Sequence, residues 1–220
     1  MRQALLFGVL IPSVILHEIS HGALALVFGD DTAKKAGRLT LNPLPHIDPV
    51  GTVLLPAILT FSGLGAFGWA RPVPVNPNQL RSPRNHGLLV SLVGPAVNIV
   101  IAVVAALYLR LFTPEGTALL VQAQLQGFDL GAEAPSLLNQ IVFTAGFINV
   151  ILAAFNLIPL PPLDGSAVIE RFLPLRWFAS WLRIRNYSLG LLLIVMLVFG
   201  RQLSSTVFAP AIELWSRLLV

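Results

Sequence analysis

The sequence predicts an all-α polytopic membrane protein, a bundle of about four to five transmembrane helices with a re-entrant segment and a short edge strand. Of its 220 residues, 55% are hydrophobic and only 11% are charged, and the mean hydropathy is +0.80. A typical soluble domain carries about 25% charged residues, so this chain has too few charges to cover a water-soluble fold. We expect residues 1–220 to form a single membrane-embedded domain, with a core at about 10–170 and a C-terminal span and tail at about 187–220.

The first apolar run, at about residues 3–28, is expected to be a transmembrane helix, because about 20 residues of helix cross a hydrocarbon core. A signal peptide is the alternative, but this stretch contains His17, Glu18 and His21 and shows no small-residue cleavage pattern. Three further spans are expected at about residues 87–112, 138–160 and 187–208. Residues 209–220 either lie at the membrane interface or extend the last span, and the sequence leaves both open.

A shorter apolar segment at residues 51–67 is broken by proline and glycine. Basic residues flank it on both sides: Lys34, Lys35, Arg38, Arg71, Arg81 and Arg84. Because positive clusters favour the cytoplasmic side, we expect the segment to re-enter rather than cross, although its length leaves a crossing open. The loop at 113–137 carries acids and no Lys or Arg, whereas 165–186 carries four arginines. This distribution predicts a multi-pass protein of the cell (inner) membrane with its amino terminus outside.

The motif His17-Glu18-Ile19-Ser20-His21 lies inside the first predicted helix. Positions i and i+4 share a helix face, so both imidazoles can reach one Zn²⁺ ion, and Glu18 borders that face as a base for water. Ionisable side chains in an apolar helix cost a few kcal/mol each, which favours a functional site over hydrogen-bonded packing residues. The chain has no cysteine, so His, Asp and Glu are the available ligands.

A catalytic zinc commonly takes three protein ligands, and the third must come from another segment. The candidates are His46, Asp48, His86 and Asp164. Asp164 is best placed because three prolines break the chain after the third span and let it bend back. The alternative for Asp164 is a residue of an ordinary Asp-Gly turn. His46 and Asp48 could line an entrance, bind a second metal or simply satisfy a loop, and His86 fits an interfacial position.

Together these motifs resemble the site-2 protease family of intramembrane zinc metalloproteases. The resemblance rests on His17 to His21, Gly94-Pro95-Ala96-Val97-Asn98, and Asn156 to Gly165. It implies that His17, His21 and Asp164 bind one zinc ion, that Glu18 is the general base, and that the substrate is a transmembrane segment of another protein in the lipid bilayer. Relatives often carry a preceding span, a PDZ domain or a nucleotide-binding domain. None is visible here, so we expect a minimal member with its active site toward the cytoplasm.

Four residues are expected to bind the substrate or to stabilise the transition state. Asn98 either donates to a developing oxyanion or forms an interhelical hydrogen bond. Asn156 has the same two interpretations, and the resemblance favours contact with substrate backbone. Pro72 and Pro74 remove donors from one edge of the predicted strand 68–76, which leaves Val73 and Val75 to pair with an unwound substrate. A rigid connector is the alternative.

Other functions are less consistent with the sequence. The formal net charge is +4, but the basic residues form no dense run with interleaved aromatics, so no nucleic-acid partner is expected. A cation transporter is an alternative, although no internal repeat is visible. A catalytically silent scaffold is a second alternative, and the presence of Glu18 argues against it.

Overall fold

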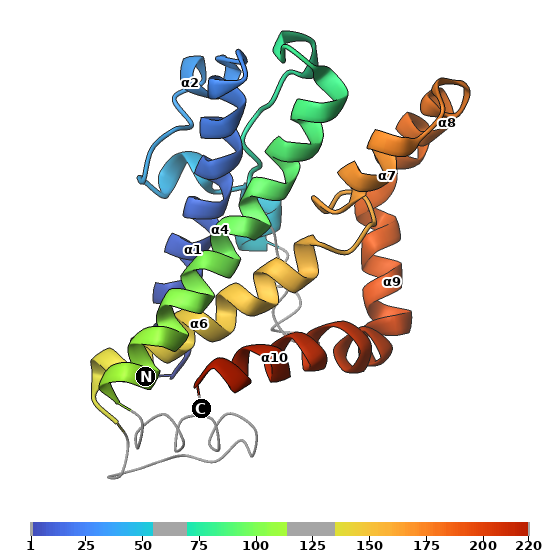
Figure 1. Ribbon diagram of the computed structural model, residues 1–220. Helices are drawn as coiled ribbons and strands as arrows, with labels where there is room; N and C mark the ends of the chain where they lie inside the picture. The colour runs from blue at the N-terminus through green and yellow to red at the C-terminus, as the bar shows by residue number, and fades with distance from the viewer. Residues whose placement is uncertain (1, 55–69, 114–134, 220) are drawn as a thin grey trace.

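The computed structural model describes residues 2–54, 70–113 and 135–219. The elements are α1 (Arg2–Val27), α2 (Thr32–Lys35), η1 (Leu44–His46), η2 (Pro49–Leu54), η3 (Pro77–Gln79), α4 (Pro83–Phe112), α6 (Leu137–Asn156), α7 (Ser166–Phe172), α8 (Leu175–Asn186), α9 (Ser188–Leu203), η5 (Ser204–Phe208) and α10 (Ala209–Leu219). Within these ranges every regular element is helical, which confirms the predicted all-α class (Figure 1).

Four helical stretches of the described chain are long and apolar enough to cross a membrane: Ala4–Val27, Pro83–Phe112, Leu137–Asn156 and Ser188–Leu219. They confirm the expected spans. In Figure 1, α1 and α6 run in one direction while α4 and α9 run in the other, which is the expected alternation. The third span ends at Asn156 rather than near residue 160. Pro159 and the two prolines after it disfavour helix in the residues before them, so the helix stops early.

The bundle is built from α1, α4 and α6, each of which packs against the other two. Its apolar core joins α4 and α6 through Ala102, Ala106, Leu109, Phe143 and Val150. Small residues let the two backbones approach closely, as is usual between membrane helices. Helix α1, which carries the His-Glu-Ile-Ser-His motif, packs against both α4 and α6.

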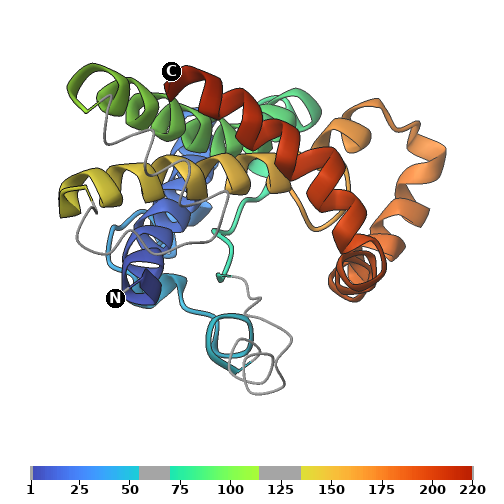
Figure 2. The same ribbon diagram turned by 90° about the horizontal axis from the view of Figure 1, so that it is seen from below.

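The C-terminal tail is a helix that turns back onto the bundle. After η5 the chain changes direction, and α10 lies along α4 and α6 in both views (Figures 1 and 2). Trp215 of α10 is buried and donates its indole N–H to the carbonyl of Ala102 at 2.8 Å. The tail is therefore packed against protein and is not a straight extension of α9.

The expected edge strand is not seen. Residues 70–76 are irregular, and the rest of the predicted strand lies outside the described residues, as do residues 55–67 of the predicted re-entrant segment. The remaining backbone donors take other partners: Arg71 donates to the carbonyl of His46 at 2.8 Å, and Val73 donates to Glu18 at 2.8 Å. Since Pro72 and Pro74 have no N–H, little is left to pair with a neighbouring strand.

Candidate metal centre

Helix α1 presents two imidazoles, one turn apart, toward the centre of the bundle. His17 and His21 are both buried, at 6% and 8% exposure. Gly94 of α4 lies directly against them: a Cβ atom added there would come within 2.6 Å of Cε1 of either ring. The absence of a side chain at this position therefore lets the backbone of α4 pass beside both imidazoles.

Asp164 reaches the same place from the turn that follows α6. The backbone N–H of Gly165 donates to the carbonyl of Asn156 at 2.6 Å, which closes the loop onto the end of the helix. A Cβ atom at Gly165 would clash with the backbone carbonyl of Leu157 and lie 2.6 Å from that of Ile158, so only glycine fits this close approach. The proline-containing turn thus fixes where Asp164 projects.

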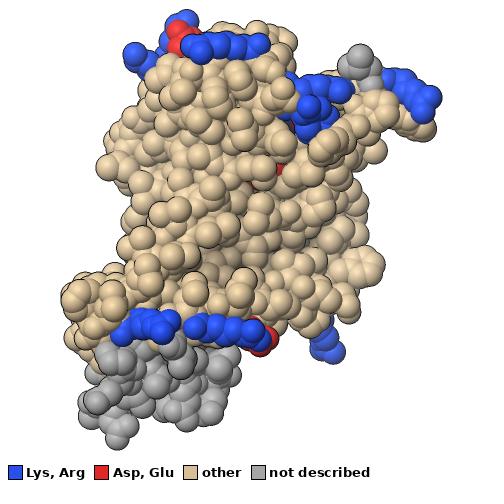
Figure 3. Space-filling model, in the orientation of Figure 1, with Lys and Arg blue, Asp and Glu red and all other residues tan. Residues whose placement is uncertain are grey.

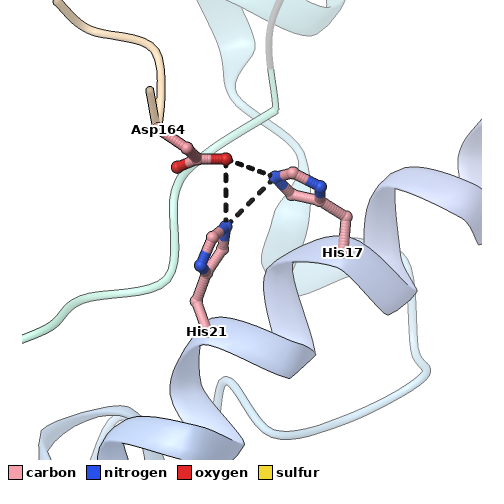
Figure 4. Close-up of side chains that lie close together, drawn as sticks. All are labelled: His17, His21 and Asp164. Carbon is pink, nitrogen blue, oxygen red and sulfur yellow. Dashed lines mark hydrogen bonds and ion pairs between the residues drawn. The ribbon is translucent and has the colours of Figure 1, made fainter. Parts of the chain in front are cut away.

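The three side chains converge on one point (Figure 4). Oδ2 of Asp164 lies 3.1 Å from Nε2 of His17 and 3.4 Å from Nε2 of His21, and the two Nε2 atoms are 3.0 Å apart. The three ligand atoms all lie within 4.8 Å of one another. Residues more than 140 positions apart in the sequence therefore share one site.

The far nitrogens of the two rings show which atoms face the site. Nδ1 of His17 lies 2.6 Å from Oδ1 of Asn98, and Nδ1 of His21 lies 2.6 Å from the carbonyl of Val90. Both partners are acceptors, so each Nδ1 carries the proton and each Nε2 keeps a bare lone pair. Oδ2 of Asp164 is buried and receives no hydrogen bond.

The two Nε2 atoms and Oδ2 of Asp164 each direct a lone pair at the same point with no proton between them. Such a point can bind a cation. Two imidazole nitrogens and one carboxylate oxygen are the donor set of many catalytic zinc sites. Hydrogen bonds on the far nitrogens orient the rings, as they do around protein-bound zinc. The residues present therefore fit a zinc ion.

Glu18 follows His17 in α1 and contacts the chain that follows the undescribed segment. Its Oε2 accepts the backbone N–H of Val73 at 2.8 Å. Val73 is buried, and Val75 packs on the cluster of Ala25, Leu80 and Val90. Both predicted strand residues are thus close to α1, but the Val73 donor is already used.

The other candidate residues lie in different surroundings. The amide of Asn156 donates to the carbonyl of Leu152 at 3.0 Å within α6. His46 Nε2 donates to the carbonyl of Thr40 at 3.0 Å, Asp48 accepts from the first turn of η2, and His86 stacks on Phe28 at the start of α4. These last three serve their loops or helix ends and do not join the converging residues.

The residues predicted from the sequence did not include two buried polar residues behind His17, namely Asn149 and Ser13. Asn149 of α6 is fully buried and accepts from Asn98 at 2.6 Å, and it donates to Ser13 of α1 at 2.8 Å. A polar side chain in the middle of a predicted span is itself a signal, because it needs a partner within the bilayer.

Comparisons with known proteins identify the family. The sequence model of peptidase family M50 matches residues 5–199. "Putative zinc metalloprotease YwhC" of Bacillus subtilis is 38% identical over 204 residues, which cover 93% of this chain and 84% of that protein. A Rip2 protein of Mycolicibacterium smegmatis with the same description is 31% identical over 72% of this chain and 53% of its own length. "Zinc metalloprotease MJ0392" of Methanocaldococcus jannaschii is 24% identical over 90% of this chain and 43% of its own. No solved structure gives a significant match.

Proposed function

The chain belongs to peptidase family M50 and is a zinc metalloprotease, and from that premise we propose that it hydrolyses a peptide bond within or near a transmembrane segment of another protein. The observation that carries the proposal is the position of His17, His21 and Asp164 inside a bundle of membrane-spanning helices. A ligand set among such helices lies within the part of the protein that shares the bilayer with a transmembrane substrate. The chain is accordingly an integral membrane protein in contact with lipid.

His17, His21 and Asp164 would hold one zinc ion, with the remaining coordination position left for water or substrate. When bound, zinc acts as a Lewis acid that polarises the scissile carbonyl and lowers the pKa of water. The chain contributes the rigidity of the site. Both imidazoles are held from behind by hydrogen bonds, and the Asp164 turn is closed onto α6.

Glu18 is the general base in this proposal. It neighbours His17 on the same helix, and its Oε2 is held by the backbone of Val73. From there the carboxylate takes a proton from the attacking water and passes it to the leaving amine. This hydrogen bond keeps the carboxylate oriented until substrate binds.

Val73, Val75 and Asn156 are proposed to contact the substrate backbone. Because the N–H of Val73 donates to Glu18, a substrate strand that pairs there must displace this bond. Substrate binding would then release Glu18 at the moment the base is needed. The carbonyl of Asn156 accepts from Gly165 and its amide donates to Leu152, so the contact with substrate would use the side-chain oxygen or the second amide N–H.

On the face drawn in Figure 3, Lys and Arg gather at the two ends of the molecule, and the band between them shows no Lys or Arg and only a small acidic patch. Such a band suits a bilayer, with Lys and Arg near the headgroups. We propose that the end formed by α2, the start of α4 and α8 faces the cytoplasm of the cell membrane, which places the site nearer that side.

The experiment compares purified wild type with Glu18→Gln and Asp164→Ala, in detergent, on a model transmembrane substrate. Glu18→Gln should lower the cleavage rate by about 10²–10⁴-fold, as expected for loss of a general base, while zinc content stays close to that of wild type. Asp164→Ala should lower both. Undiminished cleavage by Glu18→Gln would show that the proposed base is wrong, and full zinc content in Asp164→Ala would remove Asp164 from the site.

A further inference from the structure

A series of buried hydrogen bonds crosses the bundle and ends on His17. From the metal side, Nδ1 of His17 meets Oδ1 of Asn98 at 2.6 Å, and the amide of Asn98 donates to Oδ1 of Asn149 at 2.6 Å. The amide of Asn149 donates to Oγ of Ser13 at 2.8 Å. The series joins α1, α4 and α6. Asn98 and Asn149 are completely buried and Ser13 is 4% exposed.

The direction of every bond in the series is fixed by two backbone carbonyls. Ser13 donates its hydroxyl to the carbonyl of Val9 at 2.8 Å, so its oxygen is left to accept from Asn149. Asn149 also donates to the carbonyl of Ala145 at 2.8 Å. A carbonyl can only accept, so the NH₂ group of Asn149 must face these two partners and its Oδ1 must face Asn98.

This polarity continues to His17. Since Oδ1 of Asn149 can only accept, Asn98 must turn its NH₂ group toward α6 and its Oδ1 toward α1. The imidazole must then donate from Nδ1. A neutral imidazole has a single N–H, so Nε2 of His17 is left without a proton. That is the atom 3.1 Å from Asp164.

We propose that Asn149, supported by Ser13, is a positioning residue that sets the tautomer of His17 through Asn98 and so keeps Nε2 free for the metal. Asn98 contacts Nδ1 of His17, the ring nitrogen that faces away from the metal site. Three polar side chains in an apolar bundle are costly to bury unless each is satisfied, and here the satisfied arrangement has one polarity only. The proposal rests on the metal role given to His17 above.

His21 provides an internal comparison. Its Nδ1 meets the backbone carbonyl of Val90 at 2.6 Å, and a backbone carbonyl cannot reverse into a donor. An amide can, by rotating its O and N. The tautomer of His21 is thus fixed by the main chain, whereas that of His17 depends on Asn98 and, behind it, on Asn149.

The test uses zinc-free and zinc-loaded full-length protein in detergent, with ¹⁵N-histidine NMR to identify the tautomer and a competition titration to measure zinc affinity. In zinc-free wild type, both His17 and His21 should be protonated on Nδ1. In Asn149→Leu, Asn98 loses its acceptor and can rotate. His17 should then shift toward the Nε2–H form while His21 does not, and zinc affinity should fall about 10–100-fold, the usual cost of losing such support.

Two matched variants separate positioning from general stability. Asn149→Asp keeps an acceptor toward Asn98, so zinc affinity should stay within about threefold of wild type even though the buried acid lowers the unfolding temperature. Trp215→Phe removes another buried interhelical bond, to Ala102, and should lower stability with no change in zinc affinity. If Asn149→Leu does not accumulate, Asn149→Ala removes the same acceptor with less crowding.

The outcomes distinguish this inference from the proposed function. An Nε2–H tautomer of His17 in zinc-free wild type overturns the inference without any variant, as does unchanged zinc affinity in Asn149→Leu. Equal loss of affinity in Trp215→Phe and Asn149→Leu also overturns it, because both would then act through stability. Failure of wild type to bind zinc at all would instead remove the proposed function.

Discussion

The bundle of α1, α4 and α6 and the arm formed by α8 and α9 use apolar residues in different ways. Within the candidate spans, 39% of the α6 window and 33% of the α4 window are buried inside the protein, against 6% for the window that includes α9. Both views place α8 and α9 to one side of the bundle (Figures 1 and 2). Six large residues of α9 are exposed: Leu189, Leu191, Ile194, Leu197, Val198 and Phe199. In an integral membrane protein, such a face meets lipid.

This difference in burial between the bundle and the arm indicates where polar side chains can be placed. The bundle surrounds the converging ligands and the asparagines behind them, because its helices supply hydrogen-bond partners that lipid does not. The α9 segment carries one charged residue, Arg201, in its last turn. We therefore expect substitutions in the bundle to change stability and the metal site, and similar substitutions in α9 to change little.

The largest expected effect comes from one truncation made in each region. Leu109 of α4 is completely buried, whereas Leu197 of α9 is 76% exposed. Leu109→Ala should lower the free energy of unfolding by about 2–5 kcal/mol, since it leaves a cavity beside Phe143 and Trp215. Leu197→Ala should change it by less than about 0.5 kcal/mol. Unfolding in detergent, followed by circular dichroism, measures both, and equal losses would show that α9 is packed as tightly as the bundle.

A second pair lies within α4 and tests the metal side of the bundle. Gly94→Ala places a methyl group against both imidazoles, whereas a Cβ atom at Gly87 meets nothing within 4 Å. Gly94→Ala should cost about 1–3 kcal/mol as overpacking and should lower zinc affinity by displacing His17 and His21. Gly87→Ala should be neutral or stabilise by up to about 1 kcal/mol. Thermal unfolding and zinc titration measure the two effects, and normal zinc binding by Gly94→Ala would show that α4 can move away.

The sequence predicted the spans well because length and apolarity set them almost alone. It also singled out His17, His21 and Asp164, since helical periodicity places the first two on one face and proline explains the bend before the third. It could not predict the partner of Val73. The contact with Glu18 joins residues 55 positions apart and depends on how α1 lies against an irregular segment. An edge strand was expected because local pattern cannot show that distant side chains take its donors.

Asn149 shows a different kind of miss. The polar residue is visible inside an apolar span, and this position by itself indicates that the side chain needs a buried hydrogen-bond partner. The identity of that partner depends on how α6 is rotated relative to α1 and α4. The periodicity of a single helix does not determine this rotation. The local sequence pattern thus indicates that such a residue is hydrogen-bonded, while the packing of the helices determines its partner.

The smallest expected effect concerns the loop end of the bundle, where Asp30 follows α1. Asp30 is completely buried. Burial alone would raise the pKa of its carboxyl group, but hydrogen bonds from the hydroxyl and N–H of Thr32 and from the N–H of Asn76 outweigh burial and lower the pKa. A carboxyl group with a lowered pKa adds stability above its unfolded pKa of about 3.9 and loses it as pH falls through the folded value. Wild type should therefore lose about 1–2 kcal/mol as pH falls below about 4.

Asp30→Asn should remove that part of the pH dependence and lower stability at neutral pH by a similar amount, about 1–2 kcal/mol. Asp31→Asn is the matched control, since the Asp31 carboxylate lies at the surface in an ion pair with Lys35 at 2.8 Å, and such pairs contribute about 0–1 kcal/mol. Unfolding midpoints between neutral and acidic pH measure both variants. If Asp30→Asn shows the same loss of stability at acidic pH as wild type, another carboxylate must cause that loss. Substitution at the loop end would then change stability as little as substitution in the arm.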